Sequence, residues 1–124
     1  PNVSNKLISQ IDLFNSLSSI IGSDQKTHDG ENLSSLLLSG NGKEREKLIL
    51  EAFGKTALKM KNWVLIPPYK GSAVSRYTNV ELGNSKDYQL YNLNDDPSQK
   101  TNLKETEKEK FNELLETYNE IINN

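Results

Sequence analysis

The segment from residue 89 to residue 103 constrains the fold of this chain most strongly. It reads Gln-Leu-Tyr-Asn-Leu-Asn-Asp-Asp-Pro-Ser-Gln-Lys-Thr-Asn-Leu. A short apolar strand is followed by a turn of Asn and Asp residues, whose side chains bond nearby backbone groups, and Pro97 prevents the strand from continuing. An Asn102-Leu103 pair then leads into a long amphipathic stretch. The segment therefore predicts a strand at the edge of a sheet, a tight turn and a helix.

The middle of the chain is typical of β-structure. In residues 55–61, Thr56, Leu58 and Met60 alternate with Ala57 and three lysines, which indicates a strand with one solvated side. A tight turn at Lys61-Asn62 leads into a second apolar segment, which predicts an antiparallel hairpin, and Pro67-Pro68 ends it because two backbone donors are lost. The candidate strands are residues 48–53, 55–61, 63–66 and 87–93.

The C-terminal residues carry one apolar stripe at helical spacing. Thr106 is the expected start of this helix, with Glu109 completing a capping box. The glutamates between Glu107 and Glu120 lie mainly off the stripe, so we expect the stripe to lie on one face of the sheet. The stripe consists of Phe111, Leu114, Leu115, Tyr118, Ile121 and Ile122.

Two further helices are expected before the sheet. Residues 9–22 carry the signals of a helix, with Ser9 and Asp12 resembling a capping box and Gly22 as a stop, and a shorter helix is expected near residues 31–39. The charged run Lys43–Lys47 is expected to be an exposed connection. The apolar residues of the first helix are Leu13, Phe14, Leu17, Ile20 and Ile21. The predicted fold class is α+β: a small antiparallel sheet of about four strands packed by a long C-terminal amphipathic helix, with N-terminal helices.

The order of these residues resembles the sulfatase family. Residues 89–103 are similar to the segment L-Y-[DN]-L-x-x-D-P-x-E-x-x-N-L that closes the C-terminal subdomain of sulfatases, with Gln99 in place of Glu. Blocks that begin at Asp12, Asp29 and Ala57 resemble, in the family's order, D-L-x-P-T-L, D-G-x-S-L-x-P-L-L and A-[LV]-R-x-G-x-W-K-[LY]-I. Val80–Gly83 is similar to the I-E-L-G of one bacterial branch. The departures are Asn15 and Ser35 for two prolines, Asn62 for a turn glycine and Val64 for a lysine.

The resemblance implies that the catalytic residues belong to a larger domain that precedes this chain. Sulfatases carry their nucleophile on a C-x-P-S-R or S-x-P-S-R motif, whose Cys or Ser is oxidised to formylglycine, whereas this chain has no Cys and neither motif. Formylglycine and calcium are thus implied for a preceding catalytic domain. We expect no catalytic residue, no metal site and no cofactor in this piece, and no activity when it is isolated. Its expected partners are its own N-terminal catalytic domain and, in the parent, a sulfated small molecule or glycan.

The expected domain organisation follows from the same resemblance. Residues 1–124 are read as a single domain that forms the C-terminal portion of a larger sulfatase. Within it, residues 1–42 are expected to be a helical segment that continues from the catalytic domain, and residues 43–124 to form the sheet and the C-terminal helix. The whole piece is expected to act as scaffold and as part of the active-site rim.

Residues 69–85 are the best candidate for a functional segment. They form a long polar loop by sequence, and a loop of this length in a compact domain is usually functional or disordered. Lys70, Arg76 and Tyr77 in this loop suit hydrogen bonding to a sulfate or a sugar hydroxyl. Because the resemblance implies that such loops approach the active-site cleft, we predict that these three residues line the substrate rim.

Other conspicuous residues favour structural interpretations. His28 lies in a polar loop without a second ligand, which indicates a solvated side chain. Asn94-Asp95-Asp96 lacks the alternate carboxylates, glycine and distant glutamate of an EF-hand, so a strand-ending turn is favoured over a metal site. Trp63 is expected to anchor the hairpin in the core.

Charge and hydropathy limit the possible partners. The net charge of −2 suggests no general affinity for nucleic acid. Residues 43–86 are richer in Lys and Arg than in acids, which fits lysines that solvate the outer face of strands or, alternatively, a weakly basic rim near an anionic sulfate ester. No apolar run approaches the roughly 18 residues needed to span a bilayer. The family resemblance implies a periplasmic or secreted bacterial protein.

Two alternatives remain open from the sequence. One is a stand-alone binding or interaction module, although the apolar face of the first helix argues against it. The other is the equivalent subdomain of a related phosphatase or phosphotransferase. The sequence upstream of Pro1 would separate these readings, because each implies a different nucleophile or none.

Overall fold

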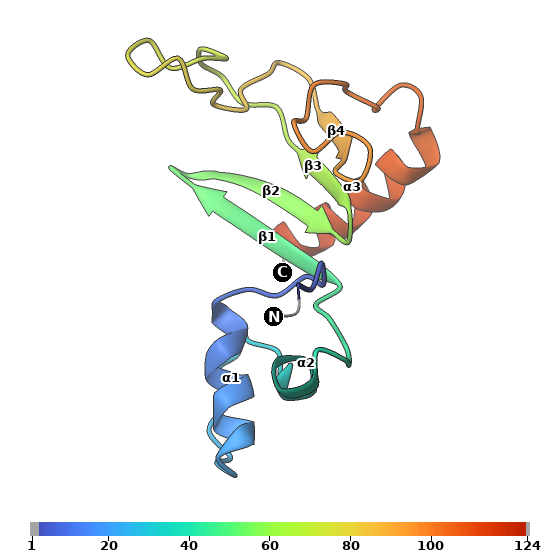
Figure 1. Ribbon diagram of the computed structural model, residues 1–124. Helices are drawn as coiled ribbons and strands as arrows, with labels where there is room; N and C mark the ends of the chain where they lie inside the picture. Colours follow the sequence, from blue (N-terminus) through green and yellow to red (C-terminus); the bar gives the residue numbers. More distant parts are fainter. Residues whose placement is uncertain (1–2, 124) are drawn as a thin grey trace. The chain divides into compact units, whose positions relative to one another are not determined.

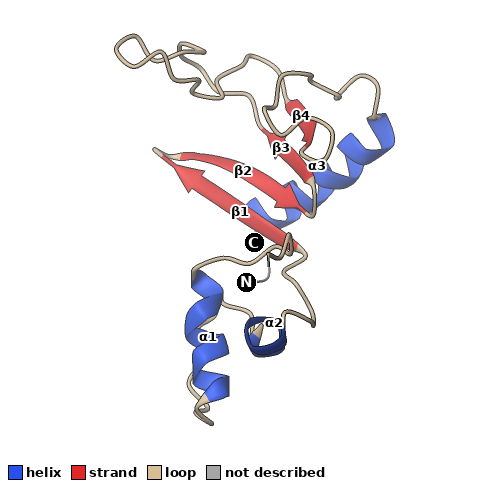
Figure 2. Cartoon of the chain, in the orientation of Figure 1, coloured by secondary structure: helices blue, strands red, loops and turns tan. Residues whose placement is uncertain are grey.

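The computed structural model describes residues 3–123 (Figure 1, Figure 2). The chain divides into two compact units, Pro1–Leu48 and Ile49–Asn124. The elements in chain order are α1 (Ile11–Ile20), α2 (Ser34–Ser39), β1 (Lys47–Ala52), β2 (Lys55–Met60), β3 (Trp63–Ile66), β4 (Gln89–Asn92) and α3 (Lys108–Ile122). This is the α+β class that the sequence predicts, and the expected strands agree with the observed ones to within two residues at each end.

The sheet has the strand order β1-β2-β3-β4, so each strand lies beside its neighbour in the chain. β2 pairs antiparallel with β3, and β3 with β4. Figure 2 shows β1 and β2 running in opposite directions. Met60 pairs with Trp63 across the predicted Lys61-Asn62 turn, in which Lys61 adopts a φ of 49°. The hairpin prediction is therefore confirmed.

One row of leucines across the sheet forms the floor of the core. The strand register aligns Leu58 with Leu65 and Leu65 with Leu90, and all three side chains are fully buried. α3 packs against β2 and β3 and adds Leu114 and Tyr118 to this cluster. Burial of each leucine contributes about 1.5–3 kcal/mol. The predicted stripe of α3 is thus confirmed, except that Ile122 at its end is half-exposed and lies outside the core cluster.

Hydrogen bonds explain the turn in the segment 89–103. The Asp96 N–H donates to the Asn92 carbonyl at 2.9 Å, which closes the chain reversal after β4. The Asp96 carboxylate in turn accepts hydrogen bonds from the N–H groups of Lys100 at 2.6 Å and Thr101 at 2.8 Å. Gln99 adopts a φ of 53° within this turn. The Asn and Asp side chains therefore act on the backbone, as the sequence predicts.

The Asn102-Leu103 pair returns the chain to the exposed edge of β4. The Asn102 side chain accepts from the Leu90 N–H at 3.0 Å and donates to the Tyr88 carbonyl at 3.1 Å, while the Leu103 N–H donates to the Leu90 carbonyl at 2.8 Å. These bonds satisfy backbone groups that an edge strand would otherwise leave unpaired.

The predicted start of the C-terminal helix is wrong. α3 begins at Lys108 with Glu107 at its N-cap, and no side chain caps it. The Thr106 hydroxyl instead donates to the Leu103 carbonyl at 3.2 Å, and the Glu107 N–H donates to the same carbonyl at 2.8 Å. A turn that follows Leu103 thus uses Thr106, so the capping box with Glu109 does not form.

Candidate functional site

The segment 69–85 is a braced hairpin and not an irregular loop. The Tyr69 N–H donates to the Ser85 carbonyl at 2.8 Å and closes its base. Further up, Val74 and Glu81 form an antiparallel bridge. The Leu82 N–H donates to the Ala73 carbonyl and the Ser75 N–H to the Val80 carbonyl, both at 2.8 Å. The long polar loop that the sequence predicts is therefore ordered by backbone hydrogen bonds and by one isolated bridge.

The tip of the hairpin carries two of the three predicted rim residues. Arg76 and Tyr77 are both exposed, and the Arg76 guanidinium carbon lies 6.0 Å from the centroid of the Tyr77 ring. The Asn79 N–H donates to the Ser75 carbonyl at 3.0 Å, and the Thr78 hydroxyl donates to Ser75 Oγ at 2.8 Å. These bonds fix the turn, so a cation and an aromatic face are presented together to solvent.

The third predicted rim residue, Lys70, lies at the base of the hairpin. Its side chain is exposed, and it follows Tyr69 directly in the chain. Among the described residues, no hydrogen bond or ring contact joins Lys70 to Arg76 or Tyr77. The structure therefore brings Arg76 and Tyr77 together and leaves Lys70 apart from them.

The base of the hairpin is fixed to the sheet by a tyrosine that the sequence analysis did not single out. The Tyr69 hydroxyl accepts from the Thr56 N–H at 2.6 Å and donates to the Thr56 carbonyl at 2.9 Å. Thr56 Oγ1 lies 2.6 Å from the hydroxyl of Tyr118 on α3. Burial raises the pKa of the Tyr118 hydroxyl above its ordinary value. One residue of β2 thus connects the hairpin base with the C-terminal helix.

A second set of contacts supports the other side of the hairpin. The Lys55 ammonium donates to the Asn84 side chain, and Asn84 Nδ2 donates to the Ser72 carbonyl at 2.7 Å. Gln89 Nε2 donates to the Gly83 carbonyl at 2.9 Å. Beside these contacts lies a hollow of about 260 Å³. It is lined mainly by apolar groups, among them Leu50, Ala52, Ala57, Ile66, Tyr69 and Leu82.

Three interpretations of single residues are confirmed. His28 is exposed. Trp63 is partly buried and packs against the core cluster beneath α3. Asn94 and Asp95 belong to the turn after β4, where the Asn92 side chain donates to the Asp95 carboxylate at 2.7 Å.

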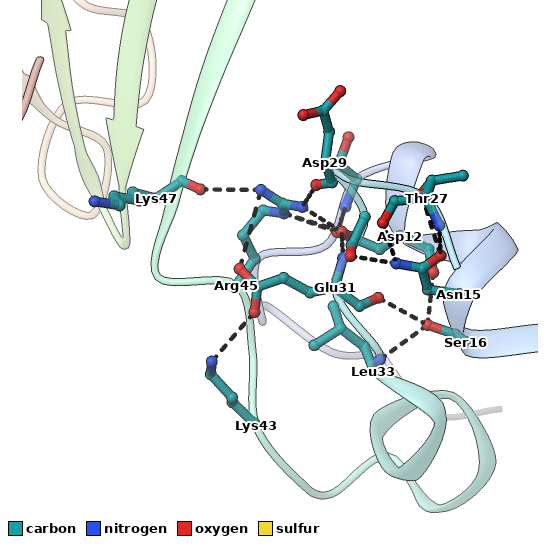
Figure 3. Close-up of polar contacts among 12 residues, drawn as sticks. Asp12, Asn15, Ser16, Thr27, Asp29, Glu31, Leu33, Lys43, Arg45 and Lys47 are labelled. Atoms are coloured by element: carbon teal, nitrogen blue, oxygen red, sulfur yellow. Dashed lines mark hydrogen bonds and ion pairs between the residues drawn. The ribbon is translucent and has the colours of Figure 1, made fainter. Parts of the chain in front are cut away.

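Unit 1 contains a buried polar cluster that sequence reasoning missed (Figure 3). Arg45 Nε lies 3.1 and 3.0 Å from the two carboxylate oxygens of Asp12, and its Nη2 lies 2.5 Å from one of them. Asp12 is fully buried and Arg45 nearly so. The same guanidinium donates to the Asp29 carbonyl at 2.6 Å. The expectation that Lys43–Lys47 is wholly exposed is therefore wrong at Arg45.

Asp12 is held ionised by this environment. Burial raises the pKa of its carboxyl, but hydrogen bonds from Arg45 and from the N–H groups of Glu31 and Ser9 outweigh that effect and lower the pKa below its ordinary value. The hydrogen bond to Asp12 likewise raises the pKa of Arg45. The Ser9 N–H bond is the half of the predicted capping box that forms. The motif indicated the cap, but nothing in it indicated a partner more than thirty positions away.

Two further residues of α1 turn their polar groups inward. Asn15 accepts from the Thr27 N–H at 2.6 Å and donates to the Thr27 carbonyl at 3.1 Å and to the Gly30 carbonyl. Ser16 Oγ donates to the Asp12 carbonyl at 2.6 Å and accepts from the Leu33 N–H at 2.9 Å. These bonds fix the segment between α1 and α2, so the cluster is an internal scaffold whose polar groups already have partners.

The structure also bears on metal and membrane sites. Over residues 3–123, no group of three or more His, Asp or Glu side chains is arranged to hold a metal ion. Within the same range, no helix is both long and apolar enough to cross a bilayer.

The sheet, its long packed helix and the Asn/Asp turn that joins them form a small α+β subdomain. No protein-family model matches the chain. An N-acetylgalactosamine-6-O-sulfatase from Bacteroides thetaiotaomicron is 32% identical over 120 residues, which is 94% of this chain and 24% of that protein. A solved sulfatase structure from work on the metabolism of multiple glycosaminoglycans by the same organism matches the whole chain. The two are 30% identical in sequence, with a TM-score of 0.87.

Both similarities cover nearly all of this chain but only part of each relative. The chain covers 27% of the solved sulfatase and so spans about a quarter of the length of both relatives. In sequence and in fold it corresponds to a C-terminal sulfatase subdomain.

Proposed function

We propose that this chain completes the fold of an exported bacterial sulfatase and forms part of the rim of its active-site cleft. The observation that carries this proposal is the similarity to the N-acetylgalactosamine-6-O-sulfatase along almost the whole chain. In this proposal the nucleophile, its formylglycine and the calcium ion belong to the catalytic domain, which is the partner of this chain. The isolated chain hydrolyses no sulfate ester, and the parent acts in the periplasm or outside the cell.

The proposed substrate of the parent is a sulfated glycan, in particular one with 6-O-sulfated N-acetylgalactosamine. The name of the relative motivates this choice. The rim residues are Arg76, Tyr77 and Lys70. A guanidinium can donate two parallel hydrogen bonds to a sulfate group, and an exposed tyrosine ring beside it can lie against a sugar. The ammonium of Lys70 adds a second positive charge for an incoming anion.

The test uses the longer parent protein with calcium present. Hydrolysis is measured on 6-O-sulfated N-acetylgalactosamine, on a chromogenic aryl sulfate and on the matching aryl phosphate. The proposal expects release of sulfate by the parent and no turnover by the 124-residue chain. Hydrolysis of the phosphate ester alone would instead support the phosphatase alternative. Sulfate release by the repurified chain would contradict the proposed division of labour.

A further inference from the structure

Pro67 interrupts the backbone pairing of the sheet where the chain leaves β3. The register pairs Leu58 of β2 with Leu65 of β3. Continued by two positions, this register would place Pro67 opposite Thr56. Proline has no backbone N–H, so it cannot exchange the two hydrogen bonds that such a pair requires. The sequence thus leaves Thr56 of β2 without a full partner from β3.

The hydroxyl of Tyr69 takes the place of that missing partner. It accepts a hydrogen bond from the Thr56 N–H at 2.6 Å and donates one to the Thr56 carbonyl at 2.9 Å. Both residues are half-buried, so an unpaired backbone group at Thr56 would be costly. The Tyr69 N–H also donates to the Ser85 carbonyl at 2.8 Å. One residue therefore joins both arms of the hairpin at residues 69–85 to β2.

The hairpin depends on polar contacts for its direction, because none of the side chains of residues 69–85 is buried. Its returning arm is held by the side chains of Lys55 in β2 and Gln89 in β4. Its entering arm is held to β2 by Tyr69. Loss of the Tyr69 hydroxyl would therefore release one of the two arms and let the hairpin pivot on the other.

The backbone of the hairpin transmits the position of its base to its tip. The N–H groups of Leu82 and Ser75 donate to carbonyls of the opposite arm, both at 2.8 Å, and so join the two arms. The bonds that fix the turn at Ser75 hold Arg76 beside Tyr77. The contacts from β2 to the tip are continuous, so a change at Tyr69 alters where the tip residues lie.

We propose that Tyr69 is a positioning residue for the substrate rim, because its hydroxyl sets the direction of the hairpin that carries Arg76 and Tyr77. This rests on the proposed function, in which Arg76 and Tyr77 help to capture a sulfated glycan. Tyr69 acts through these two residues and does not itself touch the substrate. Its effect falls on capture of the anion and not on hydrolysis, so it appears in KM and not in kcat.

The test compares two variants of the parent protein that each remove one hydroxyl bonded to Thr56. Tyr69→Phe breaks the contacts that hold the entering arm, whereas Tyr118→Phe breaks the contact of Thr56 Oγ1 with α3 and leaves the hairpin base intact. We expect Tyr69→Phe to raise KM for 6-O-sulfated N-acetylgalactosamine by about three- to tenfold with little change in kcat. Tyr118→Phe should leave KM at the wild-type value.

A double-mutant cycle asks whether Tyr69 acts through the tip. In a parent that already carries Arg76→Ala/Tyr77→Ala, the further change Tyr69→Phe should leave KM unaltered, because the residues through which it acts are gone. A merely structural effect of Tyr69→Phe would change KM by the same factor in both backgrounds.

Hydrogen–deuterium exchange of the parent gives a readout that needs no catalysis. The N–H groups of Ser75 and Leu82 bond across the hairpin. Their exchange should become several-fold faster in Tyr69→Phe and stay at the wild-type rate in Tyr118→Phe, because a hairpin released at one arm opens more often.

Each of three results would overturn the proposal. The first is a wild-type KM for Tyr69→Phe in a parent that cleaves the sulfate ester. The second is an equal effect of Tyr69→Phe with and without Arg76 and Tyr77. The third is equal exchange of the hairpin amides in Tyr69→Phe and Tyr118→Phe. A parent that cleaves no sulfate ester would instead refute the proposed function, and the exchange rates would still decide whether Tyr69 fixes the hairpin.

Discussion

Arg45 donates hydrogen bonds from two guanidinium nitrogens to the buried carboxylate of Asp12, and this ion pair joins α1 to the segment that precedes β1. Removal of one partner would leave a charge buried without compensation, which typically costs about 3–5 kcal/mol. We therefore expect Asp12→Ala to destabilise the chain by that amount in urea unfolding followed by far-UV circular dichroism. Lys43→Ala is the control, because its ion pair with Glu31 is exposed and is worth about 1 kcal/mol or less. Similar losses for both variants would contradict this role.

The same pair predicts how stability depends on pH. The folded-state pKa of Asp12 lies below its ordinary value of about 3.9, so the folded chain binds fewer protons than the unfolded chain in acid. Its stabilisation is complete above the unfolded-state pKa and is lost as the pH falls through the folded-state pKa. Urea midpoints measured between about pH 2 and pH 6 should fall toward acid more steeply for the wild type than for Asp12→Asn. Parallel curves would exclude this contribution.

The docking of α3 gives a third prediction. Leu114 is buried against the leucine row of the sheet, so Leu114→Asp places an unpaired charge in the core and should cost about 4 kcal/mol or more. Glu116 is exposed on the same helix, and Glu116→Ala should change the free energy of unfolding by about 0.5 kcal/mol or less. Thermal unfolding followed through Trp63 fluorescence compares them. Equal Tm values would mean that α3 is not packed on the sheet.

The turn between β1 and β2 predicts a stabilising substitution. Phe53 and Gly54 both have positive φ angles, of 53° and 69°, and the Phe53 side chain is fully exposed. Asn tolerates this conformation better than Phe, and an Asn-Gly pair is preferred in two-residue hairpin turns. Phe53→Asn should therefore raise the free energy of unfolding of the chain by up to about 1 kcal/mol. Phe53→Ala is the control, because it also removes the ring but does not supply a residue that favours a positive φ. Equal stability of Phe53→Ala and Phe53→Asn would argue against backbone strain at Phe53.

The sheet and its helix could be predicted because their signals are local. Alternation in residues 55–61 identifies Leu58 as inward-facing, and the spacing of the C-terminal stripe identifies Leu114 and Tyr118. Asn and Asp after β4 bond backbone groups a few residues away, so their turn is encoded where it forms. In each case the residues that decide the structure lie within one element and its adjoining turn.

The orientation of α1 could not be predicted in the same way. Apolar periodicity identifies the helix but does not say what covers the apolar side. The inward side is fixed by Arg45, which lies in a charged run whose sequence gives no sign of burial. The hairpin at residues 69–85 was missed for a related reason. It is held by Tyr69 bonding to Thr56 across the fold, and a single hydroxyl has no periodicity to detect.

The proposed rim residues are tested in the parent by removing their charges. Lys70 and Arg76 are exposed, and we expect the double replacement Lys70→Ala/Arg76→Ala to raise KM by about three- to tenfold with little change in kcat, because a rim charge aids capture of an anion more than chemistry. The control Lys100→Ala/Lys108→Ala removes the same charge from exposed positions outside the hairpin. The difference in KM between the two double variants should shrink as the salt concentration is raised, since the Debye length falls to about 10 Å at 0.1 M ionic strength. If both double variants match the wild type in kcat/KM at low salt, where steering is strongest, the hairpin does not form the substrate rim.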